Sequence, residues 1–119
     1  MPRFILLEHV GAPDDPAGRH YDLLLEDGDA CRTWRLAAVP VAGGEAVEAT
    51  PIAPHRLAWL DHIDGPVSGN RGHAVRIDAG SFTWIDTAKA SVEGTFRVRL
   101  EGESLRGDLT IANGHAVIG

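Results

Sequence analysis

The 119-residue chain has an ordinary globular composition, with 44% hydrophobic and 24% charged residues, which excludes a disordered chain and predicts one domain over residues 1–119. No apolar run approaches the roughly 20 residues of a membrane-spanning helix, and the N-terminal residues lack the features of a signal peptide, so we expect a cytoplasmic protein without membrane attachment. The net charge of −6 disfavours non-specific nucleic-acid binding, although ten of the eleven basic residues are arginines, which can still form a local phosphate-binding patch.

Short alternating or apolar runs, cut by Gly, Pro, Asp and Asn, indicate an all-β chain. We expect strands near residues 3–9, 20–26, 30–37, 55–61, 73–78, 81–86, 92–100, 105–112 and 115–118. Tight hairpin turns are predicted at Asp27-Gly28, Ala79-Gly80, Glu101-Gly102 and Asn113-Gly114. Long surface loops are predicted over 10–19, 38–54 and 63–72, and a helical turn near 86–92. About eight strands in a chain of this length predict a small β-barrel, closed or partly open, or else a sandwich.

The cysteine and the tryptophans inside these elements are expected to have packing roles. Cys31 is the only cysteine, which excludes an internal disulfide, and we expect a small buried side chain rather than a reactive thiol. Trp34, Trp59 and Trp84 lie within predicted apolar strands, so we expect them to pack in the core, with base stacking as the alternative. The acidic pair Asp14-Asp15 is expected to be a solvated turn.

The stretch around His20 and Asp22 carries the first candidate site. Residues two apart in a strand project from the same face, so these two side chains can converge on one point. His9 ends the first apolar run and supplies a third group, which completes a His, His, carboxylate set typical of divalent-metal sites with open positions. The alternative is structural, with the histidines capping strand ends and Asp22 accepting backbone hydrogen bonds.

Several motifs together resemble one family. They are Arg3-Phe4-Ile5-Leu6-Leu7-Glu8-His9, Arg19-His20-Tyr21-Asp22-Leu23, Arg32-Thr33-Trp34, Arg56-Leu57, Asp61-His62, Phe96-Arg97-Val98 and the run from Gly102 to Leu109. The chain is similar in these motifs, over most of its length, to the 3′-phosphoesterase domain of bacterial DNA ligase D and its stand-alone relatives, the DNA polymerase/ligase N-terminal domain family.

The resemblance implies a small β-barrel enzyme, a metal-dependent phosphoric ester hydrolase of DNA end repair. It would remove 3′-terminal phosphate or ribonucleotide from nucleic-acid ends and leave a 3′-hydroxyl. By motif position, His9, His20 and Asp22 would bind the metal, with Mn²⁺ expected and Zn²⁺ or Co²⁺ as alternatives. Arg56 would hold phosphate oxygens, and His62 would contact the phosphate and assist its transfer, roles that suit a guanidinium and an imidazole. A continuous strand over 56–62 would put these two on a common face.

The chain departs from the family pattern at three places. Leu24 stands where the family has an arginine, a tyrosine is missing in the stretch Ile63-Asp64-Gly65-Pro66, and the loop Val10 to Arg19 is longer and acidic. That loop would either close over the site or project into solvent. Arg71 and His73 are further candidates for the site, and Arg71 would replace the missing cation.

Three functions stay open at this point. The first is the phosphoesterase acting on nucleic-acid 3′ ends, with a separate ligase or polymerase of end joining as a candidate partner. The second is a degenerate domain that binds nucleic-acid ends or a repair partner without turnover. The third is a phosphoesterase with a small-molecule substrate. The structural alternative for Arg56 is a surface ion pair with Asp61 or Asp64. The structural alternative for His62 is an ordinary loop histidine. The oligomeric state is open as well.

Overall fold

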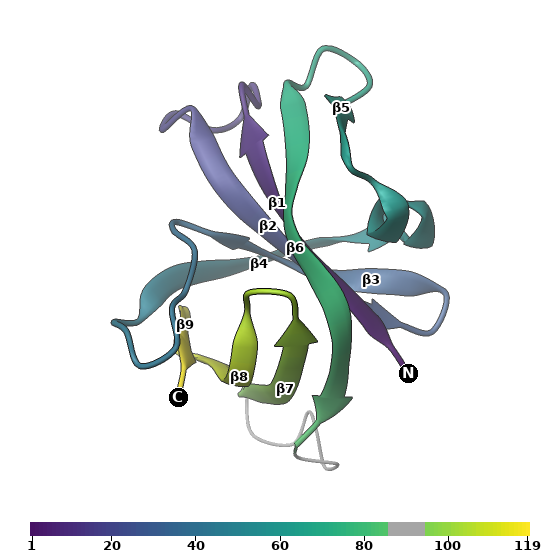
Figure 1. The fold of residues 1–119 in the computed structure, drawn as a ribbon. Coiled ribbons are helices and arrows are strands. Elements are labelled where there is room, and N and C mark those ends of the chain that lie inside the picture. The colour runs from purple at the N-terminus through teal and green to yellow at the C-terminus, as the bar shows by residue number, and fades with distance from the viewer. Residues whose placement is uncertain (86–94) are drawn as a thin grey trace.

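The computed structural model describes residues 1–85 and 95–119 and consists almost entirely of β-strands (Figure 1). The strands are β1 (Arg3–Val10), β2 (Arg19–Asp27), β3 (Ala30–Leu36), β4 (Val47–Arg56), β5 (Asp64–Pro66), β6 (His73–Trp84), β7 (Phe96–Gly102), β8 (Arg106–Ala112) and β9 (His115–Ile118). One short 3₁₀ helix, η1 (Leu57–Asp61), follows β4. The expected all-β class is confirmed.

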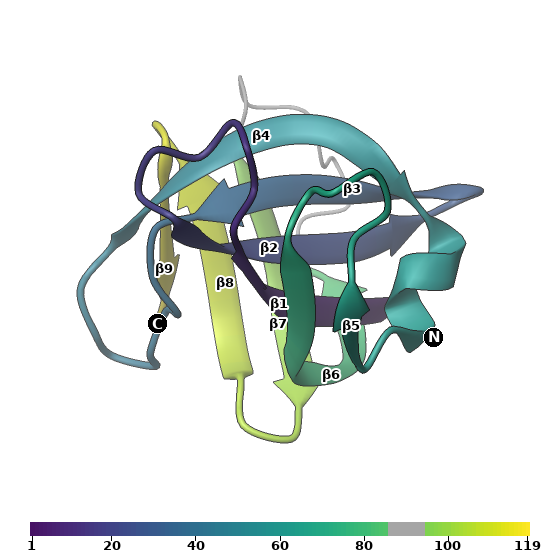
Figure 2. The same cartoon turned by 90° about the horizontal axis from the view of Figure 1, so that it is seen from above.

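Eight of the strands form a closed antiparallel barrel. The order around it is β1-β2-β3-β4-β9-β8-β7-β6, and β6 pairs back onto β1 from Arg3↔Ser81 to Val10↔His73. The ninth strand, β5, stays outside the barrel and pairs only with the first residues of β6. Figure 2, turned by 90°, shows β5 and η1 on one side of the barrel, next to β1 and β6. The predicted barrel is therefore confirmed in its closed form, and the sandwich alternative is wrong.

Apolar side chains from every strand of the barrel fill its interior. An eight-stranded barrel is just wide enough for side chains to fill it, so this interior is a packed core and not a channel. Its buried members are Phe4, Leu6, Leu23, Leu25, Trp34, Leu36, Ala49, Phe82, Phe96, Val98, Leu100, Leu105, Leu109, Ile111, Ala116 and Ile118. Trp84 packs against them. The expected core positions of Trp34 and Trp84 are confirmed.

A second apolar cluster lies on the outer face of the wall made by β1, β2 and β3. Strand residues alternate between the two faces, so the neighbours of the interior residues point outward here. The cluster consists of Ile5, Leu7, Leu24, Cys31 and Leu60. Leu60 belongs to η1, which therefore covers this outer face. Burial raises the pKa of the Cys31 thiol, so the side chain stays protonated and serves as packing, as expected.

Several predicted element boundaries are wrong, each for an identifiable reason. Much of the predicted loop 38–54 is strand β4, whose two prolines and mostly exposed side chains hide the strand pattern. The predicted strand 55–61 is the end of β4 followed by η1, so Arg56 and His62 do not share one strand face. The predicted loop 63–72 contains the short strand β5. The helical turn expected near 86–92 lies outside the described residues.

The predicted hairpin at Ala79-Gly80 is also wrong, because β6 runs through it without a break. Gly80 lies opposite Gly102 of β7, and a Cβ at Gly80 would be 2.3 Å from the carbonyl oxygen of Glu101. The glycine allows two strands to approach closely and does not mark a turn. In contrast, Asn113 and Gly114 both have positive φ, at 55° and 76°, so the hairpin expected there is confirmed.

The turn after β7 is stabilised by hydrogen bonds to one buried carboxylate. Asp78 of β6 is 4% exposed and accepts hydrogen bonds from the backbone N–H groups of Glu103, Ser104 and Leu105, at 3.0, 3.0 and 2.6 Å. Three donors to one ionised side chain compensate for its burial. The predicted turn at Glu101-Gly102 therefore lies a few residues later, between Gly102 and Arg106.

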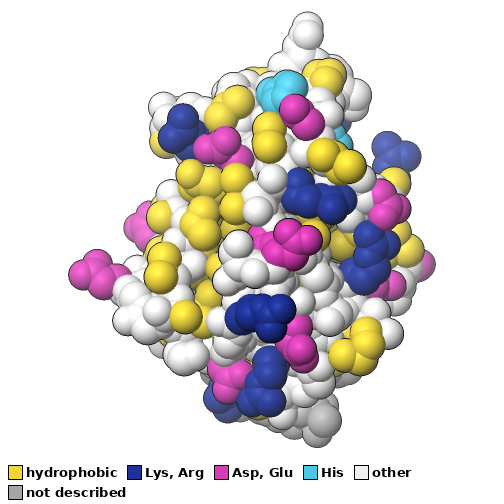
Figure 3. Space-filling model, in the orientation of Figure 1, with side chains coloured by type: hydrophobic (Ala, Val, Ile, Leu, Met, Phe, Trp, Pro, Cys, Tyr) yellow, Lys and Arg dark blue, Asp and Glu magenta, His cyan; other side chains and the backbone are white. Residues whose placement is uncertain are grey.

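The surface carries no strong segregation of charge on the face that Figure 3 shows, where basic and acidic side chains are interspersed with apolar ones in the described part of the chain. Within residues 1–85 and 95–119, no helix has the length and apolar character needed to cross a membrane.

Candidate metal centre

The three residues expected to bind a metal lie together on the outer face of the barrel wall. His9 of β1 is directly opposite His20 of β2 in the antiparallel ladder, and Asp22 follows two residues later on the same face of β2. They continue the outward rows that begin with Leu7 and Leu24, so the apolar outer cluster changes into a polar one near the ends of the two strands. The predicted convergence of these side chains is therefore found in the structure.

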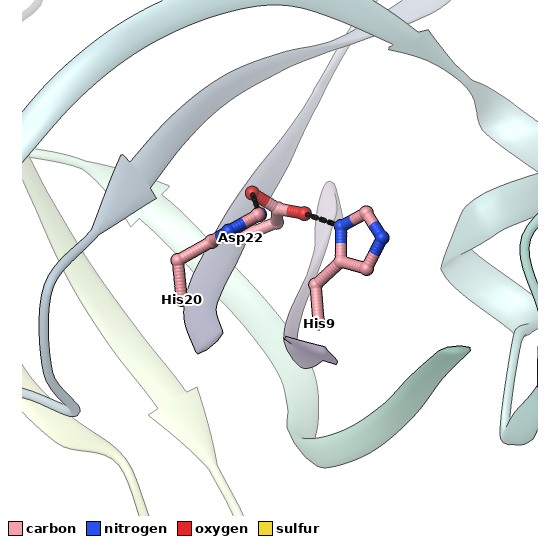
Figure 4. Close-up of side chains that lie close together, drawn as sticks. All are labelled: His9, His20 and Asp22. Carbon is pink, nitrogen blue, oxygen red and sulfur yellow. Dashed lines mark hydrogen bonds and ion pairs between the residues drawn. The ribbon is translucent and has the colours of Figure 1, made fainter. Parts of the chain in front are cut away.

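The two imidazoles approach the carboxylate of Asp22 from either side (Figure 4). His9 Nδ1 lies 3.3 Å from Asp22 Oδ2, and His20 Nε2 lies 3.2 Å from Asp22 Oδ1. One potential ligand atom from each residue lies within 4.8 Å of the others. His20 is 3% exposed and Asp22 is 4% exposed, while the His9 side chain is 14% exposed. The cluster is thus nearly removed from water.

The far nitrogen of each ring is engaged by an acceptor. His9 Nε2 lies 2.7 Å from the carbonyl oxygen of Arg71, and His20 Nδ1 lies 2.8 Å from Asp15 Oδ2. A carbonyl and a carboxylate can only accept, so each of these ring nitrogens carries the proton and donates it. The hydrogen bond from His20 lowers the pKa of Asp15, which keeps this acceptor ionised. Both outer partners therefore fix the tautomer of a ring, as they do for histidine ligands of metals.

This arrangement leaves lone pairs facing one another. In the neutral rings, His9 Nδ1 and His20 Nε2 are unprotonated and point at the Asp22 carboxylate, which is unfavourable unless a metal ion or an additional proton lies between them. His20 Nε2 and Asp22 Oδ1 are also buried without a hydrogen-bond partner. Among the described residues, Asp22 accepts no backbone hydrogen bond. The structural alternative for Asp22 is therefore not found, and the set of donor atoms is compatible with a divalent metal ion.

The cluster opens into a pocket of about 730 Å³. Its lining includes the candidate ligands His9 and Asp22, and it also includes three arginines, Arg35, Arg56 and Arg71. Cationic guanidinium groups beside a carboxylate-containing metal site are suited to bind phosphate oxygens. The expected contribution of Arg71 to the same site is therefore matched by its position.

The loop between β1 and β2 is largely exposed, but Ala12 and Asp15 turn inward beside the site. The Asp15 side chain is only 8% exposed against His20, and Asp14 reaches Arg35 with 3.5 Å between Oδ2 and Nη2. The expectation of a solvated acidic turn is therefore wrong for Asp15. Ala12, Pro13 and Asp14 line the pocket as well.

Arg56 and His62 occupy different parts of the site. Arg56 precedes η1 and lines both the main pocket and a second hollow of about 380 Å³, and Trp59 lines both as well. His62 lines only the second hollow, where its ring lies 4.7 Å from that of Trp59 and its Nε2 donates to the carbonyl oxygen of Ala74 at 2.8 Å. Arg56 therefore shares a pocket lining with His9 and Asp22, whereas His62 shares only the second hollow with Arg56.

Within the described part of the chain, Arg56 forms no ion pair with Asp61 or Asp64. Asp61 pairs with Arg3 at 2.7 Å, and Asp64 pairs with His73. His73 is exposed and is absent from the pocket lining. Trp59 lies on η1 and not in a strand, so its expected core position is only partly met, since it also faces both hollows. Leu24, which stands where the family has an arginine, is fully buried under η1. This position is therefore shielded from solvent by η1.

Sequence patterns did not single out Arg35 or Asp15 as parts of the site. Arg35 follows Thr33 by two positions and so shares its strand face, but only the β2–β3 register puts it opposite Asp22. Asp15 precedes His20 by five residues, and only the folded loop brings it to the ring. Neither a scan of models of known protein families nor a search of curated proteins finds a match to this chain.

Proposed function

We propose that the protein is a metal-dependent phosphoesterase that removes a terminal phosphate or ribonucleotide from nucleic-acid 3′ ends. The observation that carries this proposal is the buried Asp22 carboxylate between two imidazoles whose outer nitrogens are held protonated by Asp15 and by the carbonyl of Arg71. Such a set is suited to hold a metal cation, and the pocket beside it offers arginines for the phosphate.

Each residue of the site has a part in this function. His9, His20 and Asp22 would hold the ion, which when bound would polarise a phosphoryl oxygen or activate a water. Arg56 and Arg71 would neutralise the charge of the phosphate in the main pocket. His62 would exchange a proton with the departing group from the neighbouring hollow, because imidazole changes its protonation near neutral pH.

The choice of a nucleic-acid 3′ end as substrate and of Mn²⁺ as metal is supported by the resemblance to the DNA ligase D phosphoesterase domain. The same resemblance supports a role in DNA end repair next to a separate ligase or polymerase. The donor set alone would accept Zn²⁺ or Co²⁺ equally well.

A second function is favoured by the position of His62. This ring donates to the Ala74 carbonyl and lines the second hollow, apart from the metal ligands. A protein that holds a 3′-phosphorylated end at the metal without cleaving it would need the arginines but no group for proton transfer.

The experiment that tests the proposal is hydrolysis of a primer ending in a 3′-phosphate or a single 3′-ribonucleotide, with Mn²⁺ and with chelator. The wild type is compared with His20→Ala and with the control His115→Ala, which changes an exposed histidine of β9. We expect Mn²⁺-dependent release in the wild type and the control and none in His20→Ala. Tight binding of the primer without release by any divalent metal would favour the second function, and activity that survives in His20→Ala would refute the metal site.

A further inference from the structure

Arg35 is the arginine closest in register to the metal ligands. It lies directly opposite Asp22 in the β2–β3 ladder, so both side chains leave the same outer face. Its side chain is 27% exposed and lines the main pocket. A cation is thus built into the strand next to the site and not only into the surrounding loops.

Among the described residues, Arg35 forms one ion pair, and that pair is weak. Its guanidinium Nη2 is 3.5 Å from Asp14 Oδ2, and the Asp14 side chain is 74% exposed, so solvent screens this pair. Asp22 is the carboxylate that register places opposite, yet its two oxygens face the rings of His9 and His20. The Arg35 guanidinium therefore retains the capacity to hold an anion.

One donor of this guanidinium is buried and unpaired. Across the described residues, three buried side-chain polar atoms lack a hydrogen-bond partner, and they are His20 Nε2, Asp22 Oδ1 and Arg35 Nε. All three belong to neighbouring positions of β2 and β3. Buried polar groups in folded proteins are nearly always paired, so an unpaired donor beside two unpaired ligand atoms points to a bound group with an oxygen for the donor.

The other two arginines of the pocket are less well placed for this task. Arg71 uses Nε and Nη2 to donate to the carbonyl oxygen and the hydroxyl of Ser68, at 2.7 and 3.1 Å. Arg56 is exposed and precedes η1 at the border of the second hollow. Arg35 alone of the three combines a strand position, partial burial and an unpaired donor.

We propose that Arg35 binds the phosphate group of the substrate at the metal centre, through the guanidinium edge that includes Nε. This inference rests on the proposed function and names the residue that holds the reacting phosphate. A guanidinium fits two phosphate oxygens at once, which an ammonium does not, so the planar group and not the charge alone is required.

The test uses inorganic phosphate as the probe and measures its binding to the Mn²⁺-loaded protein by titration calorimetry. The variants are Arg35→Gln, Arg35→Lys and the control Arg99→Gln, which alters an exposed arginine paired with Asp108 away from the pocket. Loss of one charged hydrogen-bonding group predicts a phosphate affinity about ten- to hundredfold lower for Arg35→Gln, with a smaller loss for Arg35→Lys and none for the control. Mn²⁺ affinity, measured separately, is expected to be unchanged or higher, because a neighbouring positive charge is removed.

The outcomes separate this inference from the proposed function. A wild type that binds phosphate but no Mn²⁺ refutes the metal centre, while loss of that phosphate binding in Arg35→Gln still supports the anion site. Phosphate binding by Arg35→Gln that equals the wild type, or no phosphate binding by the wild type, overturns the inference. If Arg35→Gln fails to fold, Arg35→Lys decides, since weaker phosphate binding supports the role of the planar group and unchanged binding overturns it.

Discussion

Replacement of Asp15 by asparagine is expected to weaken Mn²⁺ binding without unfolding the barrel. Asp15 Oδ2 receives the Nδ1–H of His20 at 2.8 Å, and both side chains are under a tenth exposed. The isosteric amide still offers an oxygen to the backbone N–H of Ala17, which donates to Asp15 Oδ1 at 3.0 Å in the wild type, so the loop keeps its shape.

The magnitude follows from the protonation of the His20 ring. With the carboxylate gone, the ring loses the charge-assisted hydrogen bond that had favoured the tautomer with a free Nε2 lone pair. An amide can also turn its NH₂ toward Nδ1 and favour the opposite tautomer, in which Nε2 carries the proton and cannot bind a metal. The expected loss is about ten- to hundredfold in Mn²⁺ affinity, the range usual for such outer partners.

The assay is titration of the metal-free protein with Mn²⁺ by calorimetry or by the paramagnetic resonance signal of the free ion. Asp14→Asn is the matched control, because it removes the same charge one residue earlier in the same loop from a side chain that is 74% exposed and far less tightly held. Equal losses in the two variants would show a general effect of loop charge. An unchanged affinity in Asp15→Asn would refute the tautomer argument.

Two further predictions concern stability. At an Mn²⁺ concentration about a hundredfold above its dissociation constant, binding should stabilise the wild type by about 2.7 kcal/mol, a rise of roughly 10 °C in Tm. Scanning calorimetry should show this rise in the wild type, and a rise that persists in His20→Ala would contradict the site. Asp78→Asn should lower the free energy of unfolding by about 2–4 kcal/mol, because one oxygen that accepts from Ser104 and Leu105 becomes a donor. Urea denaturation measures this loss against the exposed control Asp29→Asn. Equal stability of the two variants would show that the turn after β7 does not depend on the carboxylate.

The parts of the fold that could be predicted are those with a clear local pattern. Strands β1, β2, β3, β8 and β9 were expected within about two residues of their ends, because their apolar runs end at glycine, aspartate or asparagine turns. The barrel followed from the number of such strands. Strand β4 was missed because a strand with Pro51 and Pro54 and little burial lacks that pattern. Gly80 was interpreted as a turn, since a sequence does not reveal that a glycine faces another strand's backbone.

The candidate site divides in the same way. His20 and Asp22 are two apart on one strand, so their common face could be predicted from spacing alone. The position of His9 opposite His20 depends on the pairing of β1 with β2, and that of Arg35 on the pairing of β3 with β2. Asp15 comes to the ring through a loop whose turns depend on tertiary contacts. Residues that act through register or loop closure are therefore the ones that sequence patterns miss.

The alternation along β2 separates two tasks that one strand performs. Leu23 and Leu25 point into the barrel and hold it together, while His20, Asp22 and Leu24 point out toward the site and η1. A protein engineer could therefore recombine the outward residues and the two flanking loops to seek new metals or substrates while leaving the interior untouched. The same alternation means that a slip of β2 by one residue would bring His20 and Asp22 into the apolar core. The cost of burying these side chains there disfavours misaligned forms of the site.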